Sequence, residues 1–179
     1  MAPRPKGGNT AGQGADKQQG LNMKSKVLIP VDTARNSITA EEHAIKLNWR
    51  MPIRSTLINV INTKRIEQHG ISPDDQERIK KTMRDRAEKV LESAAEPFAK
   101  GQVEYETRVE EGDPAKILCR VAEDEGYDMV IIAQSGLSEL EEILGGSVVR
   151  TVLKRCKVPV LLVKHTEDQM EAQRKLRGR

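Results

Sequence analysis

The chain has 179 residues, of which 37% are hydrophobic and 32% are charged, so it is long enough for one domain with a core and a heavily charged surface. Its four aromatic residues are too few for the stacking platforms on which proteins bind single-stranded nucleic acid. The net charge of +3 arises at the two ends of the chain, and residues 27–164 are slightly acidic. The central part therefore gives no case for a nucleic-acid partner.

The cysteine pattern and the hydropathy exclude two further classes of protein. Cys119 and Cys156 are 37 residues apart, with no CxxC motif and no histidine near them in the sequence. This spacing argues against a disulfide scaffold or a zinc site and favours two buried or spare thiols in a reducing compartment. No apolar run approaches the roughly 18–20 residues that span a bilayer, and no signal-peptide pattern is present. The sequence predicts a soluble cytoplasmic protein.

Composition divides the chain into three parts. Residues 1–22 are rich in Gly, Pro, Ala and Gln and are expected to form a disordered N-terminal arm, either native or an added segment. Residues 23–164 are expected to form the folded domain, and residues 165–179 a charged C-terminal tail. The positive charges of the arm suggest a minor hypothesis, in which the arm recruits an anionic surface or nucleic acid.

Short apolar runs alternate with longer amphipathic segments along the domain. Apolar or alternating runs predict strands at 26–31, 55–61, 102–109, 129–133 and 159–163. The third of these alternates, with Val103, Tyr105, Thr107 and Val109 on one face, which is typical of an edge strand covered on one side. Helices are expected over about 39–49, 74–100 and 115–125, and in a short segment that Ser147 opens.

Capping and breaking residues define the expected helix ends. Ser37 or Thr39 is expected to cap the first helix, which Pro52 stops. In the long helix Pro97 is expected to bend or end the last turn. One apolar stripe along this helix is expected to be core, and it consists of Ile79, Met83, Ala87, Val90, Ala94 and Phe98. The third helix has Asp113 as its N-cap, Pro114 at its first position and Gly126 at its end; the fourth has an apolar face of Val148, Val149, Val152 and Leu153.

This order of elements predicts a three-layer α/β domain with a five-stranded parallel sheet. In such sheets ligands bind beyond the carboxyl ends of the strands, where the strand order reverses. Asp32 and the segment 134–136 both follow a strand. If the first and fourth strands are neighbours, these two features face each other across a crevice.

The glycine-bearing segment between 134 and 147 leads from the fourth strand into a helix. Backbone N–H groups at a helix start can bind an anion, since the first turn has unpaired donors and positive dipole character. A glycine loop of this kind is also a common plain turn. The rest of the chain therefore decides between the two interpretations.

The sequence from 26 to 163 resembles the universal stress protein family. The matching motifs are KVLIPVD, LINVIN, GDPAKIL, DMVIIAQSG, GGSVVRTVL and VPVLLV, in this order. The ATP-binding branch of the family carries Gly, two residues, Gly, nine residues, then Gly followed by Ser or Thr. Gly136 is followed by nine residues and then by Gly146 and Ser147, whereas Ala133 replaces the first glycine.

The resemblance implies an adenine nucleotide alpha hydrolase-like fold with strand order 3-2-1-4-5 and a homodimer formed through the last strand, 158–163. It also implies a cytoplasmic regulator that binds ATP or another adenine nucleotide, with or without Mg²⁺. Asp32 would accept a hydrogen bond from the nucleotide, Val60 would line the adenine pocket, and the loop and helix start would meet the ribose and phosphates. The implied site is Pro30, Val31, Asp32, Val60, Ala133, Gly136, Gly146, Ser147 and Val148.

Two departures from the family pattern motivate an alternative function. Ala133 adds a methyl group where a phosphate would approach, and the loop carries Glu139, Glu141 and Glu142. The alternative is a stress protein that binds no nucleotide and works through its dimer and protein partners. No Ser-His-Asp set, carboxylate pair or metal cluster is apparent, and His43, His69 and His165 are isolated, so the sequence does not predict an enzyme beyond slow ATP hydrolysis at most.

Overall fold

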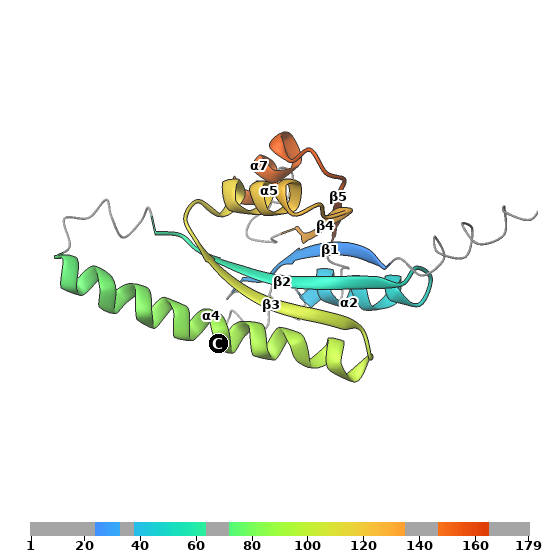
Figure 1. The fold of residues 1–179 in the computed structure, drawn as a ribbon, viewed down its shortest axis with the longest axis horizontal. Coiled ribbons are helices and arrows are strands. Elements are labelled where there is room, and N and C mark those ends of the chain that lie inside the picture. The colour runs from blue at the N-terminus through green and yellow to red at the C-terminus, as the bar shows by residue number, and fades with distance from the viewer. Residues whose placement is uncertain (1–23, 33–37, 64–71, 135–146, 165–179) are drawn as a thin grey trace, which may run out of the picture.

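In the computed structural model, which describes residues 24–32, 38–63, 72–134 and 147–164, a five-stranded parallel sheet lies between two layers of helices (Figure 1). The strand order is β3-β2-β1-β4-β5, which confirms the predicted three-layer α/β fold and its strand order. The strands are β1 (Ser25–Pro30), β2 (Ile53–Ile61), β3 (Glu104–Glu111), β4 (Met129–Ala133) and β5 (Val160–Val163).

Among the described residues, two helices cover each face of the sheet. Helices α2 (Ile38–Asn48) and α4 (Pro73–Lys100) lie on one side, and α5 (Pro114–Asp124) and α7 (Ser147–Arg155) on the other (Figure 1). Alternate residues of β1 enter the two cores, with Val27 and Ile29 on the α2/α4 side and Leu28 on the α5/α7 side. Because the central strands are buried on both faces, β1 and β4 contain continuous apolar runs, whereas β2 also includes the buried polar residues Ser55, Thr56 and Asn59.

The strand predictions agree closely with the structure. The predicted bounds of β4 are confirmed, and the other strands are displaced by one or two residues at their ends, as is usual for element boundaries. Strand β3 is an edge of the sheet, and Tyr105, Thr107 and Val109 face α4, as the alternating pattern indicates. The opposite face of β3 carries charged side chains.

The apolar stripe of α4 is only partly core. Ala87, Ala94 and Phe98 are buried as predicted, but Met83 is 37% exposed, so its assignment to the core is wrong. The buried residues of α4 begin at Ala87, although the helix begins at Pro73. The first half of this long helix lies beyond the ends of the strands that its second half covers (Figure 1).

The predicted helix ends agree with the structure to within one residue, but one of the two caps predicted for the first helix does not. Thr39 is a buried residue inside α2, so it does not cap that helix, and Ser37, the other predicted cap, lies outside the described residues. Helix α2 ends at Asn48, one residue before its predicted end and before Pro52. The Asn48 side chain accepts a hydrogen bond from the Ile53 N–H at 3.0 Å and thereby connects the helix end to the start of β2. The predicted end of α4 at residue 100 is confirmed, and Pro97 lies within the last turn of the helix, which ends at Lys100.

Other ends were predicted correctly. Asp113 caps α5 by accepting from the Lys116 N–H, with Pro114 at the first position of the helix. Gly126 follows α5 with a φ of +65°, a conformation that favours glycine. Helix α7 begins at Ser147 as expected, and Val149 and Val152 are buried, but Leu153 is 47% exposed and does not belong to the apolar face.

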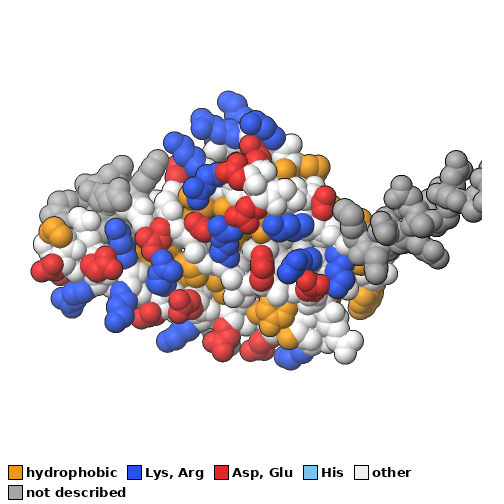
Figure 2. Space-filling model, viewed as in Figure 1, with side chains coloured by type: hydrophobic (Ala, Val, Ile, Leu, Met, Phe, Trp, Pro, Cys, Tyr) orange, Lys and Arg blue, Asp and Glu red, His pale blue; other side chains and the backbone are white. Residues whose placement is uncertain are grey.

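Charged side chains of both signs are spread over the face seen in Figure 2. Figure 2 shows both signs interspersed along α4, whereas Lys and Arg side chains gather over α7. The described part of α7 contributes Arg150, Lys154 and Arg155 and no acid. Among the described residues, no helix is both long and apolar enough to cross a membrane.

Candidate functional site at the carboxyl edge of the sheet

Strands β1 and β4 are neighbours, so the condition for a site between them is met. From β1 the chain adds β2 and β3 on one side, then crosses to add β4 and β5 on the other, which makes the β1/β4 boundary the switch point of the sheet. The ladder between these strands consists of two residue pairs and ends at Leu28 and Val130. Strand β4 continues to pair with β5 as far as Ala133 and Val163. Beyond Leu28, therefore, β1 and β4 no longer pair.

Asp32 lies at this edge, two residues after the end of β1, and is exposed. The strand end that carries it is well anchored on its β2 side: the Val31 N–H donates to the Ile58 carbonyl at 2.8 Å, and the Asn59 side chain donates to the Val31 carbonyl at 2.7 Å. Asn59 is only 8% exposed. Asn59 was missed in the sequence analysis, although a polar residue inside an apolar strand is a signal that could have identified it.

Three of the predicted site residues lie on the α5/α7 side of the sheet. Val60 and Val148 pack against the apolar cluster of that side, and Pro30 shares the face of Leu28 by strand alternation. Each is half-buried. Three apolar surfaces therefore border the edge from β1, β2 and the start of α7, a combination suited to the flat apolar faces of a base.

Val31 and Ala133 point to the opposite side. Both belong to the apolar cluster beneath α2 and α4, and Ala133 is 8% exposed. The methyl group of Ala133 thus packs into the core and does not project toward α7. Gln134 follows, with its N–H bonded to the Val163 carbonyl at 2.9 Å, and continues the β4–β5 pairing.

The distribution of charge along α7, which follows β4 in the chain, favours an anion at the start of the helix. Its first turn contains no acidic residue, and its last turn contains Lys154 and Arg155, which complement the helix dipole. The packing of Val149 and Val152 against the α5 side fixes the axis of the helix. Gly136 and Gly146 lie outside the described residues, as do Glu139, Glu141 and Glu142, and the Ser147 side chain is likewise not described.

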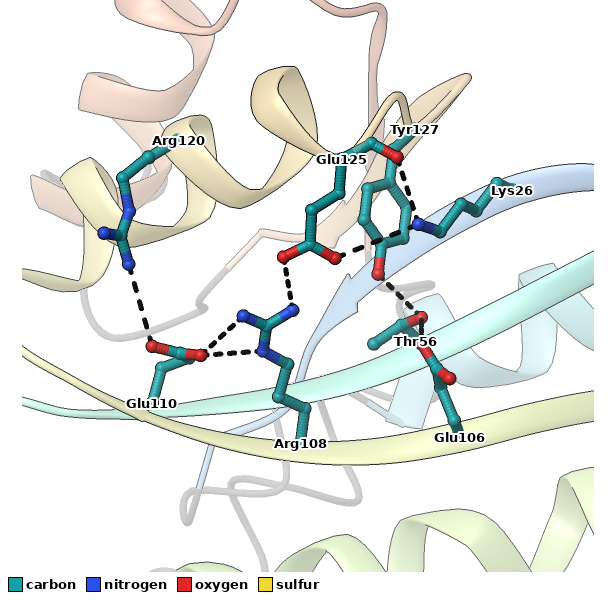
Figure 3. A network of polar contacts seen from close by, with 8 residues as sticks. All are labelled: Lys26, Thr56, Glu106, Arg108, Glu110, Arg120, Glu125 and Tyr127. Atoms are coloured by element: carbon teal, nitrogen blue, oxygen red, sulfur yellow. Dashed lines mark hydrogen bonds and ion pairs between the residues drawn. The ribbon is translucent and has the colours of Figure 1, made fainter.

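A second polar cluster, which the sequence did not predict, connects β3 with the end of α5 and the start of β1 (Figure 3). Arg108 of β3 bonds Glu110 at 2.7 Å and Glu125 at 2.6 Å, and Glu125 also pairs with Lys26 at 3.9 Å. The Glu125 and Glu110 carboxylates raise the pKa of Arg108 further. All these groups are paired with one another, so the cluster connects the open face of β3 to the end of α5 and has a structural role.

Tyr127 anchors the buried end of this cluster. Its hydroxyl donates to the Thr56 hydroxyl at 2.8 Å, Thr56 donates to Glu106 at 2.7 Å, and the Lys26 ammonium lies 4.1 Å from the ring centroid (Figure 3). Burial raises the pKa of Tyr127 above its ordinary value, because the neutral phenol is favoured there.

We expect Tyr127→Phe to lower the free energy of unfolding by about 1–2 kcal/mol at pH 7, because Thr56 is buried and loses a hydrogen-bond donor. Urea denaturation measures the loss, and Tyr105→Phe, at a tyrosine that is 39% exposed, is the matched control with little change. Because the pKa of Tyr127 is raised in the folded protein, the wild type loses stability as the pH rises above 10.0, the ordinary pKa of a tyrosine. The difference in free energy of unfolding between wild type and Tyr127→Phe should therefore narrow above that pH. A constant difference would contradict the buried neutral phenol.

A groove of about 530 Å³ lies elsewhere, between α4 and β3. Leu91, Ala95 and Tyr105 form part of its apolar lining, and Glu88, Glu92 and Glu96 line it from α4. Its acidic lining disfavours a phosphate, so among the described residues the switch point is the better candidate for an anionic ligand.

The comparisons with known proteins identify the class to which this arrangement belongs. A model of the universal stress protein family matches residues 23–164. The chain therefore belongs to the universal stress protein family. Universal stress protein MJ0531 of Methanocaldococcus jannaschii is 28% identical over 153 residues, which cover 85% of this chain and 89% of that protein.

Solved structures agree with this assignment. The structure of MJ0577, a universal stress protein of the same organism, has a TM-score of 0.68 and 26% identity, covering 81% of this chain and 99% of that one. An Arabidopsis thaliana family member with AMP bound is 18% identical, with a TM-score of 0.60 and coverage of 80% and 94%. A universal stress protein in complex with cAMP is 20% identical, with a TM-score of 0.56 and coverage of 79% and 97%.

Proposed function

We propose that this protein is a cytoplasmic, nucleotide-binding regulator that holds ATP at the carboxyl edge of its sheet. The observation that carries the proposal is the parting of β1 and β4 at the switch point, with Asp32 at the end of one strand and the start of α7 behind the other. The family members that contain AMP and cAMP support an adenine nucleotide as the ligand. ATP and an accompanying Mg²⁺ are the more specific part of the proposal.

Each predicted residue except Ala133 has a role in this arrangement. Asp32 accepts a hydrogen bond from the nucleotide, Pro30 and Val31 adjoin it, and Val60 contacts the adenine. The N–H groups of Gly146, Ser147 and Val148 receive the phosphates at the positive end of α7, and Gly136 allows close approach of the backbone. None of these roles requires a general base, so the proposed protein holds the nucleotide and hydrolyses it slowly at most.

Isothermal titration with ATP and Mg²⁺ tests the proposal, with AMP and cAMP titrated separately. We expect saturable binding with a dissociation constant below the millimolar range for at least ATP. Denaturing the purified protein and separating the released nucleotides by chromatography gives an independent test of what it carries. No binding heat at millimolar nucleotide, together with no released nucleotide, would refute the proposal.

The second candidate function is a protein that binds no nucleotide and acts through its dimer and as yet unidentified protein partners. It is motivated by Ala133 and by the acidic residues of the loop. The packing of the Ala133 methyl group into the α2/α4 core weakens the first of these reasons, because the group fills core volume there.

Because this methyl group packs into the core, we expect Ala133→Gly to change the nucleotide dissociation constant by less than about threefold. A threefold change corresponds to under 1 kcal/mol of binding free energy. The variant should lose roughly 1 kcal/mol of stability, because a buried methyl group is removed and a strand gains a glycine. Calorimetry and urea denaturation measure the two effects. An affinity gain of tenfold or more would show that the methyl group obstructs the ligand and would favour the second candidate.

We also propose a homodimer that forms through β5. This strand is an edge of the sheet with four residues, and Leu161 on it is 36% exposed, an unusual position for a leucine at an open strand edge. A second copy placed along this edge would cover Leu161 and pair the open backbone groups.

Leu161→Lys should shift the protein from dimer to monomer at micromolar concentration, because a lysine would be buried against its partner in the assembly. Light scattering coupled to size exclusion measures the mass. Met83→Lys is the matched control, since Met83 has nearly the same exposure (37%) but lies on α4, so this variant should remain dimeric. A monomeric wild type, or a dimeric Leu161→Lys, would exclude this interface.

A further inference from the structure

Cys119 and Cys156, which are 37 residues apart in the sequence, lie together where α5 meets α7. Cys119 belongs to α5 and is 9% exposed; Cys156 follows the last residue of α7 and is half-buried. Both belong to the apolar cluster that contains Leu118 and Val152. The Cys156 N–H donates to the Val152 carbonyl at 2.9 Å, which holds the residue as a continuation of α7. The two thiols are free and within hydrogen-bonding reach of each other.

The two thiols differ in environment. Burial, and then the hydrogen bond with Cys156, raise the pKa of Cys119 from its ordinary value of 9.0 to about 12; Glu123 acts in the same direction and Arg155 against it. Cys156 is the more accessible of the two, and it lies between Arg155 and Lys157, of which Lys157 pairs with Glu123 at 3.3 Å. An oxidant from solvent therefore meets Cys156 first, with Cys119 behind it as a second thiol.

We propose that Cys119 and Cys156 form a reversible intramolecular disulfide when the protein meets a hydroperoxide. The Cys156 thiolate attacks the peroxide, so that an S–O bond forms, the O–O bond breaks and an alcohol or water leaves. The sulfur of Cys119 then attacks the resulting sulfenic acid: the S–S bond forms, the S–O bond breaks, and hydroxide leaves with the proton of Cys119 as water. The two thiols are oxidised by two electrons in total and the peroxide is reduced by two.

The disulfide would connect the end of α7 to the middle of α5 and close a loop that contains β4 and the whole of α7. A closed loop of this length restricts the unfolded chain, so the oxidised protein should melt about 5–10 °C above the reduced protein. In a reducing compartment such a bond would be transient. The inference does not depend on the proposed nucleotide site.

The experiment treats the reduced full-length protein with a few equivalents of hydrogen peroxide at pH 7.5. We expect titratable thiols to fall from two to none, the intact mass to fall by two hydrogen atoms, and a non-reducing digest to contain one peptide pair joined through Cys119 and Cys156. Dithiothreitol should restore both thiols and the lower melting temperature.

Single variants separate the two roles. Cys119→Ser should leave Cys156 as a sulfenic acid that a 1,3-dione reagent traps, and Cys119→Ala gives a second form of this control if serine disturbs the core. Cys156→Ser should leave Cys119 unoxidised under the same conditions. Two unchanged thiols, separate sulfinic acids in the wild type, or a disulfide between two molecules in place of the internal one would each overturn the proposal.

Discussion

Phe98→Ala should lower the free energy of unfolding by about 3–5 kcal/mol, the range measured when a buried phenylalanine is truncated. Phe98 is the largest of the fully buried side chains among the described residues. It lies in the second half of α4, in the cluster that contains Ile29 and Leu57, and its ring centroid is 6.2 Å from that of Tyr105. Its removal leaves a cavity beneath the helix that covers β2 and β3.

A loss of this size is a large part of the 5–15 kcal/mol by which domains are usually stable, and for a chain of this length it corresponds to a fall of roughly 6–20 °C in the melting temperature. Urea denaturation followed by circular dichroism measures it. Met83→Ala on the same helix is the control, and we expect it to cost under about 1 kcal/mol because Met83 is 37% exposed. Equal losses for the two variants would show that the packing of α4 is not as described.

The contrast between these two residues shows how far periodicity predicts a fold. The spacing of apolar residues correctly predicted that α4 is amphipathic, and it placed Met83 and Phe98 on one stripe. It could not predict where along the helix the sheet ends, because that depends on the lengths and positions of strands elsewhere in the chain. Leu91 and Ala95 are buried but were not in the predicted stripe, since the face that a helix buries is set by the neighbour on which it packs.

The strands were easier to predict for a physical reason. The central strands are covered on both faces, so each contains a run of buried apolar residues, although β2 also buries Ser55, Thr56 and Asn59. The edge strand β3 is covered on one face and its alternation revealed this. The predicted faces and the strand order therefore agree with the structure, and the order itself came from the resemblance to the family.

The candidate site was only partly predictable. The sequence placed Asp32 and the start of α7 beyond strand ends, but whether β1 and β4 are neighbours is a property of the topology. The direction of the Ala133 side chain follows from strand alternation once the buried faces are known, and only the structure supplies those. The proximity of Cys119 and Cys156 depends on the packing of α5 against α7, which sequence separation does not reveal.

Asp32→Ala should weaken nucleotide binding by about 10–100-fold, because a hydrogen bond that involves a charged group contributes about 1.5–3 kcal/mol. Asp32 is exposed at the end of β1, and the bonds that Ile58 and Asn59 make to Val31 hold this strand end in place through β2. Because those bonds involve the backbone of Val31, the substitution should leave the strand end intact. The melting temperature should therefore change little while the affinity falls.

Asp124→Ala is the matched control, since it removes the same charge from an exposed site at the end of α5, at the opposite edge of the sheet. We expect Asp124→Ala to bind nucleotide as the wild type does. Asp32→Asn keeps the shape of the side chain and loses its charge, so its nucleotide affinity should lie between those of the wild type and Asp32→Ala. Calorimetric titration of the three variants measures these differences. If Asp32→Ala and Asp124→Ala bound ATP equally well, the nucleotide would have to be held without Asp32, and the binding site proposed at the β1/β4 switch point would be wrong in its central contact.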